Sequence, residues 1–389
     1  MREEIMMDAG VLLRNIMSEN DIEGILLTDP YSIRYYTGFS GEGVAVVTET
    51  SSVILTDSRY TEAAGQESNF EVQTYTVSVS QTDLLREILK KDNVRKLGFE
   101  NESISYADYK KYIGKLSADA ERQDKAEVSE AGFSDWYADA ENKAASGVRL
   151  VPLGNSLLLP RQIKSPAEIE LLRHAEHIGD LAFQDVLGIL KPGMTELEVA
   201  AELEYSMKRH GAEGLSFETI AASGMNSSKP HAVPTLKKLE MGDFLTMDFG
   251  CRYKGYCSDM TRTVCIGKAS DEQKKVYEIV RMAQAAVLEK VHAGLICKDV
   301  DAIARNMIKD AGYGDYFGHG LGHSVGLYIH ESPAFNTRDD TVLRAGMVIT
   351  DEPGIYLPGK FGVRIEDMIL ITEDGYENLA TSPKELIEL

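Results

Sequence analysis

Four segments in the second half of the chain combine the apolar pattern of a β-strand with embedded acidic residues. They are FLTMDFG (244–250), SDMTRTVCIG (258–267), GMVITDEPGIYL (346–357) and GVRIEDMILIT (362–372). Short turns join them, which favours antiparallel pairing. The chain therefore has to fold these strands into a sheet and still accommodate carboxyl groups beside its core.

The first two of these segments predict a pair of neighbouring carboxylates. Side chains alternate along a strand, so the apolar residues 245, 247 and 249 share one face and Asp248 points to the other. The next strand carries Asp259, and a hairpin would set Asp248 and Asp259 side by side. Two carboxylates that close repel each other unless they share a proton or a cation. Taken alone, they could also be two solvated acids at a strand edge.

Histidines gather in one short segment, GHGLGHSVGLYIHESP (318–333). His319, His323 and His330 alternate there with glycines, which let the backbone come close to a ligand. A lone histidine is more often a packed or surface group. We expect that of the histidines elsewhere in the helical segments: His174, His177, His210 and His292.

Two further acids lie in the last two strand-like segments. Glu352 precedes Pro-Gly, which forces a turn, and Glu366 follows Arg364 on a strand. Considered by themselves, Arg364 and Glu366 would predict a surface salt bridge.

Together these residues form an oxygen-rich set of four carboxylates and one imidazole: Asp248, Asp259, His323, Glu352 and Glu366. Such a set suits Mn²⁺ first, and could also hold Co²⁺, Fe²⁺ or Zn²⁺. Four carboxylates carry too much negative charge for one ion, and two ions bridged by carboxylates balance it better. The pattern therefore predicts the two-metal centre of a hydrolase.

Bulk composition excludes several classes of partner. The net charge is −21, from 41 basic and 62 acidic residues, so nucleic acid and anionic lipid are repelled. We see neither a bilayer-spanning run nor a signal peptide, which predicts a cytoplasmic protein with no membrane partner. The 4 cysteines form no Cys-x-x-Cys pair and are expected to be free thiols.

The length of 389 residues indicates two domains, 1–157 and 158–389. The first alternates helical and strand patterns, which predicts an α/β domain with a mixed or parallel sheet. Its helices are expected at 2–19 and 84–91, and its strands at 24–28, 44–48, 52–56 and 95–100. The Ala-, Asp-, Glu- and Ser-rich stretch 116–147, with Trp136, reads as an exposed excursion.

The second domain is predicted to be α+β with an antiparallel sheet. Ser165 to Glu168 and Thr195 to Glu198 are capping boxes that begin two helices, and the second helix should end at Gly211. Further helices are expected at 271–293 and 298–311, each closed by a glycine.

The motifs, in order and spacing, resemble the pita-bread metallopeptidase family (M24), in its branch of Xaa-Pro aminopeptidases and Xaa-Pro dipeptidases (prolidases). The resemblance runs from RQIKSPAEIELLRHA (161–175) to the end and includes SFETIAASGMNSSKPHA, HGLGHSVGLYIHE, EPGIY and GVRIED. YYTGFSG and LTDSRYTEAA resemble the family's creatinase-like N-terminal domain. The resemblance implies a curved antiparallel catalytic sheet flanked by helices, two divalent metal ions and, commonly, a homodimer.

The family pattern also implies a role for each residue. Asp248 would chelate one metal, Asp259 and Glu366 would bridge both, and His323 and Glu352 would complete the other site. A bridging hydroxide would attack the scissile carbonyl, and Glu352 could relay the proton. The remaining matches contact the substrate: His231 and His330 would stabilise the tetrahedral intermediate or leaving group, His319 lies in the substrate pocket, and Arg364 and Tyr356 support or contact the substrate.

Three functions remain open at this point. The first is a peptidase that cleaves before a proline in the second position of a peptide, as an aminopeptidase or a dipeptidase. The second is a creatinase-like amidohydrolase acting on a non-peptide C–N bond, and the third is a non-enzymatic binding protein. The complete set of five ligands argues against the last two, whose relatives lack ligands. Asp351 and Ser324 depart from the family pattern without removing a ligand.

Overall fold

The computed structural model describes residues 2–116 and 147–389. The chain divides into two compact units, Met1–Arg161 and Gln162–Leu389. Residues 117–146, which hold Trp136 and almost all of the predicted excursion, lie outside the described residues. None of the described helices has the length and apolar character needed to cross a bilayer.

The first unit contains a six-stranded mixed sheet in the order β4-β3-β2-β1-β5-β6. The strand β1 pairs antiparallel with β2 and parallel with β5, which confirms the predicted mixed α/β arrangement. Its strands are β1 (Gly24–Leu27), β2 (Gly43–Thr48), β3 (Ser52–Thr56), β4 (Glu71–Thr74), β5 (Lys96–Phe99) and β6 (Arg149–Pro152). Its helices are α1 (Arg2–Glu19), α2 (Pro30–Thr37), α3 (Thr61–Glu67), α4 (Gln81–Lys91) and α5 (Tyr106–Leu116).

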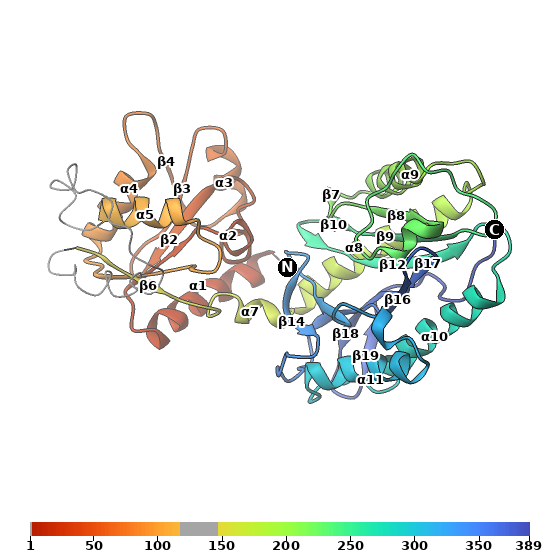
Figure 1. The fold of residues 1–389 in the computed structure, drawn as a ribbon. Coiled ribbons are helices and arrows are strands. Elements are labelled where there is room, and N and C mark those ends of the chain that lie inside the picture. The colour runs from red at the N-terminus through yellow and green to blue at the C-terminus, as the bar shows by residue number, and fades with distance from the viewer. Residues whose placement is uncertain (1, 117–146) are drawn as a thin grey trace, which may run out of the picture. The chain divides into compact units, whose positions relative to one another are not determined.

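Helices cover both faces of this sheet (Figure 1). Ile25 and Leu27 of β1 pack with α1 and α2, whereas Leu26, between them, packs with α4 and α5. Because side chains alternate along a strand, the near-continuous apolar runs of the sequence supply both cores at once.

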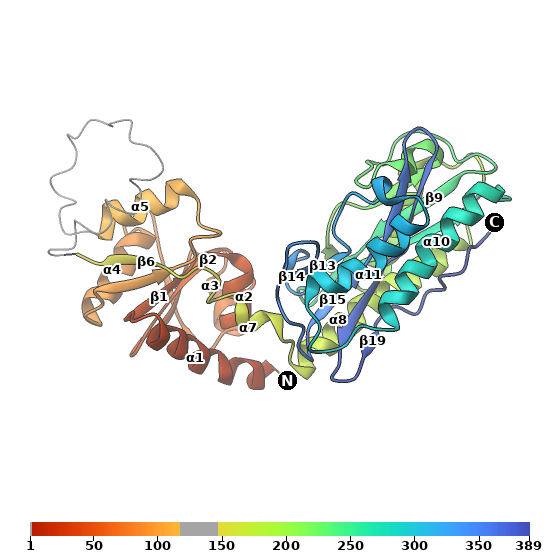
Figure 2. The ribbon, with the colours of Figure 1, turned by 60° about the horizontal axis from the view of Figure 1, so that its bottom comes forward.

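The second unit begins with two helices that carry the predicted capping boxes. Ser165 caps α8 (Pro166–Leu187) and Thr195 caps α9 (Glu196–Arg209), each with the reciprocal glutamate bond present. The later helices are α10 (Asp271–Leu288) and α11 (Cys297–Asp310), which lie side by side (Figure 2). The short helices of this unit are η1 (Gly224–Ser228) and η2 (Gly314–Tyr316), and α7 (Leu159–Gln162) spans the boundary between the two units in the sequence.

All strand pairs of the second unit are antiparallel, as predicted. Three-stranded sheets have the orders β11-β10-β7 and β12-β9-β8, a five-stranded sheet has the order β14-β13-β15-β18-β19, and β16 pairs with β17. The bounds are β7 (Gly214–Leu215), β8 (Ile220–Ser223), β9 (Phe244–Phe249), β10 (Cys251–Tyr253), β11 (Tyr256–Cys257), β12 (Met260–Cys265), β13 (Gly322–Ser324), β14 (Glu331–Phe335), β15 (Val348–Asp351), β16 (Gly354–Leu357), β17 (Phe361–Arg364), β18 (Asp367–Ile371) and β19 (Tyr376–Asn378).

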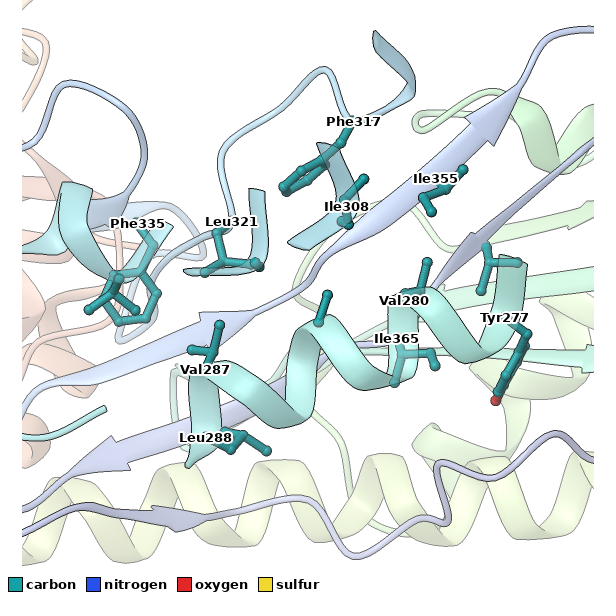
Figure 3. Close-up of a cluster of buried hydrophobic side chains, with 14 of the residues drawn as sticks. Tyr277, Val280, Val287, Leu288, Ile308, Phe317, Leu321, Phe335, Ile355 and Ile365 are labelled. Carbon is teal, nitrogen blue, oxygen red and sulfur yellow. The ribbon is translucent and has the colours of Figure 1, made fainter. Parts of the chain in front are cut away.

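Each helix pair of this unit backs one part of the strands. Residues of α8 and α9 share a core with Leu245, Met247 and Phe249, the apolar face of β9. The helices α10 and α11 share a second core with β15 to β18. Figure 3 shows Val280 and Val287 on the side of α10 that faces the strand carrying Ile355. The strand faces opposite these cores are left for polar side chains.

Three predicted elements differ from the structure. The helix expected at 271–293 ends at Leu288. The segments 346–357 and 362–372 are each divided into two strands, with breaks at Glu352-Pro353 and Ile365-Glu366. Proline cannot donate to a ladder, which accounts for the first break. At the break between Ile365 and Glu366, the Glu366 amide donates to the carbonyl of Thr261 on β12. The chain there stops pairing with β16 and goes on to pair with β15.

Candidate metal centre

The pairing of β9 with β12 brings the first two acids together. Asp248 lies opposite Thr261, and Asp259 stands just before β12 begins. The Asp259 amide donates to Glu176 Oε2 of α8 at 3.3 Å instead of to a strand, which corrects its predicted position within the strand. A Cβ on Gly250 would lie 1.9 Å from the carbonyl oxygen of Ser258, so only glycine permits this close approach.

The other acids stand at the two strand breaks. The amide of Glu352 donates to the carbonyl of Leu321 at 2.8 Å, just after β15 ends. Glu366 lies between β17 and β18, and its Oε2 accepts from Thr261 Oγ1 at 2.6 Å. Both residues therefore lie where a strand is interrupted, and their backbone amides donate to segments that are distant in the sequence.

His323 projects from β13 towards these carboxylates. Its Nδ1 donates to the Ser324 carbonyl at 3.2 Å, which leaves Nε2 with a free lone pair. This Nε2 is 3.5 Å from Asp259 Oδ2 and 3.7 Å from Glu352 Oε1. One ligand atom each from Asp259, His323 and Glu366 lie within 4.8 Å of one another, the spacing of groups that could hold a metal ion.

The electrostatics of this cluster call for positive charge. Burial, and then the neighbouring carboxylates, raise the pKa of Asp259 and Glu352 well above their usual values, and that of Glu366 to about 8. Burial lowers the pKa of His323 to about 4, so the imidazole is neutral at pH 7 and free to act as a ligand. A divalent cation would relieve the repulsion among these acids.

Arg364 has a different partner from the one that its own strand segment suggested. Arg364 pairs with Asp248 Oδ2 in a buried ion pair and forms no salt bridge with Glu366 among the described residues. The Arg364 guanidinium also donates to Tyr356 Oη at 2.7 Å and to Thr261 Oγ1 at 3.0 Å. The surface salt bridge between Arg364 and Glu366 is therefore wrong, because β17 turns its arginine towards β9.

The second carboxylate oxygen of Asp248 completes the donor set. Asp248 Oδ1 is buried without a hydrogen-bond partner among the described residues, which is costly unless something binds it. Three carboxylates, one neutral imidazole and this free oxygen are the hard oxygen and nitrogen donors that divalent cations prefer. The residues present therefore fit the two-metal centre predicted from the sequence.

The cluster opens into a cavity of about 850 Å³. The five predicted ligands line it, together with His231, His319, His330 and Arg364. Tyr356 is outside this lining but bonds to His319 Nε2 at 2.9 Å. The His330 ring stands edge-on to His323, with 4.5 Å between ring centroids. Every predicted site residue thus lies in the cavity wall or directly behind it.

The other histidines do not line this cavity, as predicted for packed or surface groups. His174 stacks on Tyr253 with 4.0 Å between ring centroids, and His210 bonds to Asp185 at 2.9 Å. His292 bonds to the neighbouring carbonyl of Ala293.

The sequence alone did not single out the residues that hold the ligands. Thr261 bonds to Glu366, and Thr350 Oγ1 lies between the His323 amide, at 3.1 Å, and Glu352 Oε1, at 3.4 Å. Asp351, which departs from the family pattern, is fully buried on β15, and neither of its carboxylate oxygens has a hydrogen-bond partner among the described residues. Of these supporting residues only Thr261 could have been found from the sequence, because a hairpin register would place it opposite Asp248.

Comparison with protein families gives two matches. The chain matches metallopeptidase family M24 over residues 170–373 and the creatinase/prolidase N-terminal domain over residues 12–130. The first match covers all five candidate ligands, and the second covers most of the α/β unit.

Individual relatives are similar over nearly the whole chain. An Xaa-Pro dipeptidase of Pyrococcus furiosus is 38% identical over 378 residues, covering 96% of this chain and 98% of the relative. The solved structure of an Xaa-Pro dipeptidase from Bacillus anthracis superposes with a TM-score of 0.87 at 39% identity, covering 98% and 99% of the two chains. An X-Pro aminopeptidase from Thermotoga maritima gives 0.83 at 35% identity, covering 96% and 100%.

Proposed function

Because this chain belongs to metallopeptidase family M24 and carries a creatinase/prolidase N-terminal domain, we propose that it hydrolyses the peptide bond before proline in short peptides. The observation that carries the proposal is the cluster of Asp259, His323 and Glu366 at the wall of a cavity large enough for a peptide. The names of relatives similar over nearly the full length support the same substrate class.

In this proposal Asp248, Asp259, His323, Glu352 and Glu366 hold two divalent cations, with Mn²⁺ as the first candidate and Co²⁺, Zn²⁺ or Fe²⁺ as alternatives. When bound, such ions supply Lewis acidity and make water a nucleophile at neutral pH. Arg364 orients Asp248 by its buried ion pair.

The chain's own groups then bind the peptide and handle the proton. Glu352 stands 3.7 Å from His323 and lines the cavity, so its carboxylate can accept a proton and pass it to the leaving nitrogen. His231 and His330 line the cavity, and in this proposal they would donate hydrogen bonds to the oxygen that gains charge in the transition state. His319 and Arg364 line the same cavity, and each forms a hydrogen bond with Tyr356 Oη.

A substrate series on Mn²⁺-loaded protein tests this proposal. Ala-Pro and Ala-Pro-Ala should be cleaved in preference to Ala-Ala and Ala-Ala-Ala, with loss of activity on chelation. If neither proline peptide is hydrolysed while the protein is folded and loaded with metal, the proposed function is wrong. Creatine serves as the probe for the amidohydrolase alternative, and we expect no turnover of it.

Assembly is a separate point of the proposal. We infer a homodimer, because family members with a creatinase-like N-terminal domain commonly form one. Light scattering on the purified protein tests this inference, and a mass of one chain at micromolar concentration would contradict it.

A further inference from the structure

The strand β15 ends in a buried carboxylate that the metal centre does not use. Asp351 is fully buried, and neither of its oxygens has a hydrogen-bond partner among the described residues. A buried charge without a partner strongly destabilises a fold. A neutral carboxylic acid would not remove the problem, because its hydroxyl would still need an acceptor within hydrogen-bond distance. The position of Asp351 therefore implies a bound group that supplies positive charge or hydrogen-bond donors.

Asp351 lies on the helix side of its sheet. Ile349 of β15 and Ile369 of β18 belong to the core that these strands share with α10 and α11. Asp351 lies two residues after Ile349, and Asp367 lies two residues before Ile369. Alternation along the strands therefore puts both carboxylates on the face of these isoleucines. Neither aspartate lines the cavity of the metal centre, so the pair is a feature separate from that cavity.

The carboxylate opposite Asp351 is already compensated. Asp351 and Asp367 are direct partners in the ladder between β15 and β18, which sets their Cβ atoms about 5 Å apart. Asp367 accepts from Arg262 at 2.7 Å, from Lys384 at 2.7 Å and from Gln284 at 2.9 Å. The two cationic side chains bind Asp367 and neither bonds to Asp351. The charge that remains to be balanced at this pair is the single charge of Asp351.

A second buried oxygen without a partner lies beside the pair. Gln284 of α10 is fully buried, and its Oε1 has no hydrogen-bond partner in the part of the chain that the structure describes. Its Nε2 donates to Asp367 Oδ2, which turns the amide towards the two carboxylates. Gln284 lies four residues after Val280 and three before Val287, on the side of α10 that faces the strands (Figure 3). Gln284 Oε1 and both oxygens of Asp351 are therefore acceptors that lack a donor.

The chemistry of these atoms indicates which ligand they would take. A carboxylate and an amide oxygen are hard donors, and carbonyl-type oxygens coordinate alkali cations in proteins. A divalent ion usually takes more carboxylates than one. Among the described residues, three histidine, cysteine or carboxylate ligand atoms come within metal-binding spacing only at Asp259, His323 and Glu366. One carboxylate charge and neutral oxygens instead match a cation with a single charge.

We propose that Asp351 and Gln284 bind an alkali cation, K⁺ or Na⁺, on the helix side of the sheet. This inference goes beyond the proposed function and does not depend on which peptide is cleaved. Asp351 directly precedes Glu352, and Asp367 directly follows Glu366. A cation bound here would therefore stabilise the two strands that lead to these candidate ligands of the catalytic metals.

Thermal unfolding of the full-length, Mn²⁺-loaded protein tests the proposal. The midpoint is measured in KCl, NaCl and tetramethylammonium chloride at equal ionic strength and constant Mn²⁺. The variants are Asp351→Val, which suits a buried strand position, and Asp351→Asn, which keeps the shape and removes the charge. Asp374→Asn is the matched control, because Asp374 is an exposed aspartate in the turn between β18 and β19 of the same sheet.

We expect the wild-type midpoint to be about 2–4 °C higher in KCl or NaCl than in tetramethylammonium chloride. Whichever of the two salts gives the larger rise identifies the preferred cation. Both Asp351 variants should lose the difference, and Asp374→Asn should keep it. Equal wild-type midpoints in all three salts would overturn the proposal and leave Asp351 a neutral or hydrated acid. A difference that Asp351→Val retains would also overturn it, because the cation would then bind elsewhere.

Anomalous diffraction locates the ion. Crystals of the Mn²⁺-loaded protein that hold Rb⁺ as the only alkali cation should show a peak beside Asp351 and Gln284, and none there in Asp351→Val. Absence of the wild-type peak at this place would overturn the assignment of the site. Neither experiment measures hydrolysis, so failure of the proposed peptidase function would leave both results intact.

Discussion

Thr261 and Glu366 meet through a 2.6 Å hydrogen bond although they are 105 residues apart in the chain. The same hydroxyl accepts from Arg364 Nε at 3.0 Å, and Arg364 pairs with Asp248. Thr261 therefore contacts the candidate ligand Glu366 directly and is connected to the candidate ligand Asp248 through Arg364. Its hydroxyl fixes which carboxylate oxygen of Glu366 is left to face the cavity, so the orientation of this acid is set before any substrate binds.

Replacing Thr261 by valine removes this link while keeping the volume of the side chain. We expect Mn²⁺ affinity to fall about 10- to 100-fold, because Glu366 loses the bond that orients it. Metal titration followed by calorimetry measures the change. Thr263→Val is the control, since Thr263 bonds to the Arg364 backbone and to Thr246 but not to a candidate ligand. Equal metal affinity in the wild type and Thr261→Val would contradict the link.

The metal cluster itself is tested by Asp259→Asn and His323→Ala. Each should abolish measurable hydrolysis of Ala-Pro and reduce the metal bound after dialysis, because each removes a donor from the closest group of ligand atoms. Asp310→Asn, an exposed change at the end of α11, should behave as the wild type. Full activity of either ligand variant would falsify the two-metal assignment.

Removal of metal should also lower stability. Buried carboxyl groups that repel one another favour unfolding, and a bound cation stabilises the folded state by about 2.7 kcal/mol at a free concentration of one hundred times its Kd. We expect chelation to lower the midpoint of thermal unfolding and Mn²⁺ to restore it. Asp259→Asn should show a smaller shift. A midpoint that does not respond to chelator or metal would count against the site.

The C-terminal segment provides a pH-dependent contribution to stability. Glu388 accepts from Lys268 Nζ at 2.8 Å and from the Ala269 amide at 2.9 Å, and the bond from Lys268 is the main cause that lowers its pKa to about 2. The folded pKa is below the unfolded value of 4.5, so this stabilisation is full above about pH 4.5 and is lost as the pH falls through about 2.

Glu388→Gln should therefore destabilise the protein at pH 7, and its difference from the wild type should shrink below pH 4.5. Denaturant unfolding at pH 7 and pH 3 measures both values. Because the Glu388 carboxylate is partly exposed and its partner Lys268 is exposed, high salt should reduce the difference at pH 7. A difference that is the same at both pH values would show that the glutamate acts by packing alone.

Much of the fold could be read from local patterns, because their causes lie within a few residues. Alternation along β9 put Leu245, Met247 and Phe249 on one face and Asp248 on the other, and the structure agrees. The capping boxes at Ser165 and Thr195 begin their helices for the same reason, since cap and acceptor are three residues apart. The strand break at Glu366 was missed, because it depends on a backbone bond from the Glu366 amide to the distant Thr261 carbonyl.

The sequence by itself determined the kind of site: four acids in strand-like segments and a histidine among glycines specify a set of metal donors whatever their exact placement. Only the tertiary structure decided how they are held. The contact of β17 with β9 made Asp248 the partner of Arg364. The register of β12 against β9 placed Thr261 beside Asp248, where its hydroxyl also binds Glu366. Side-chain partners across more than a hundred residues follow from chain closure and packing, which no local pattern encodes.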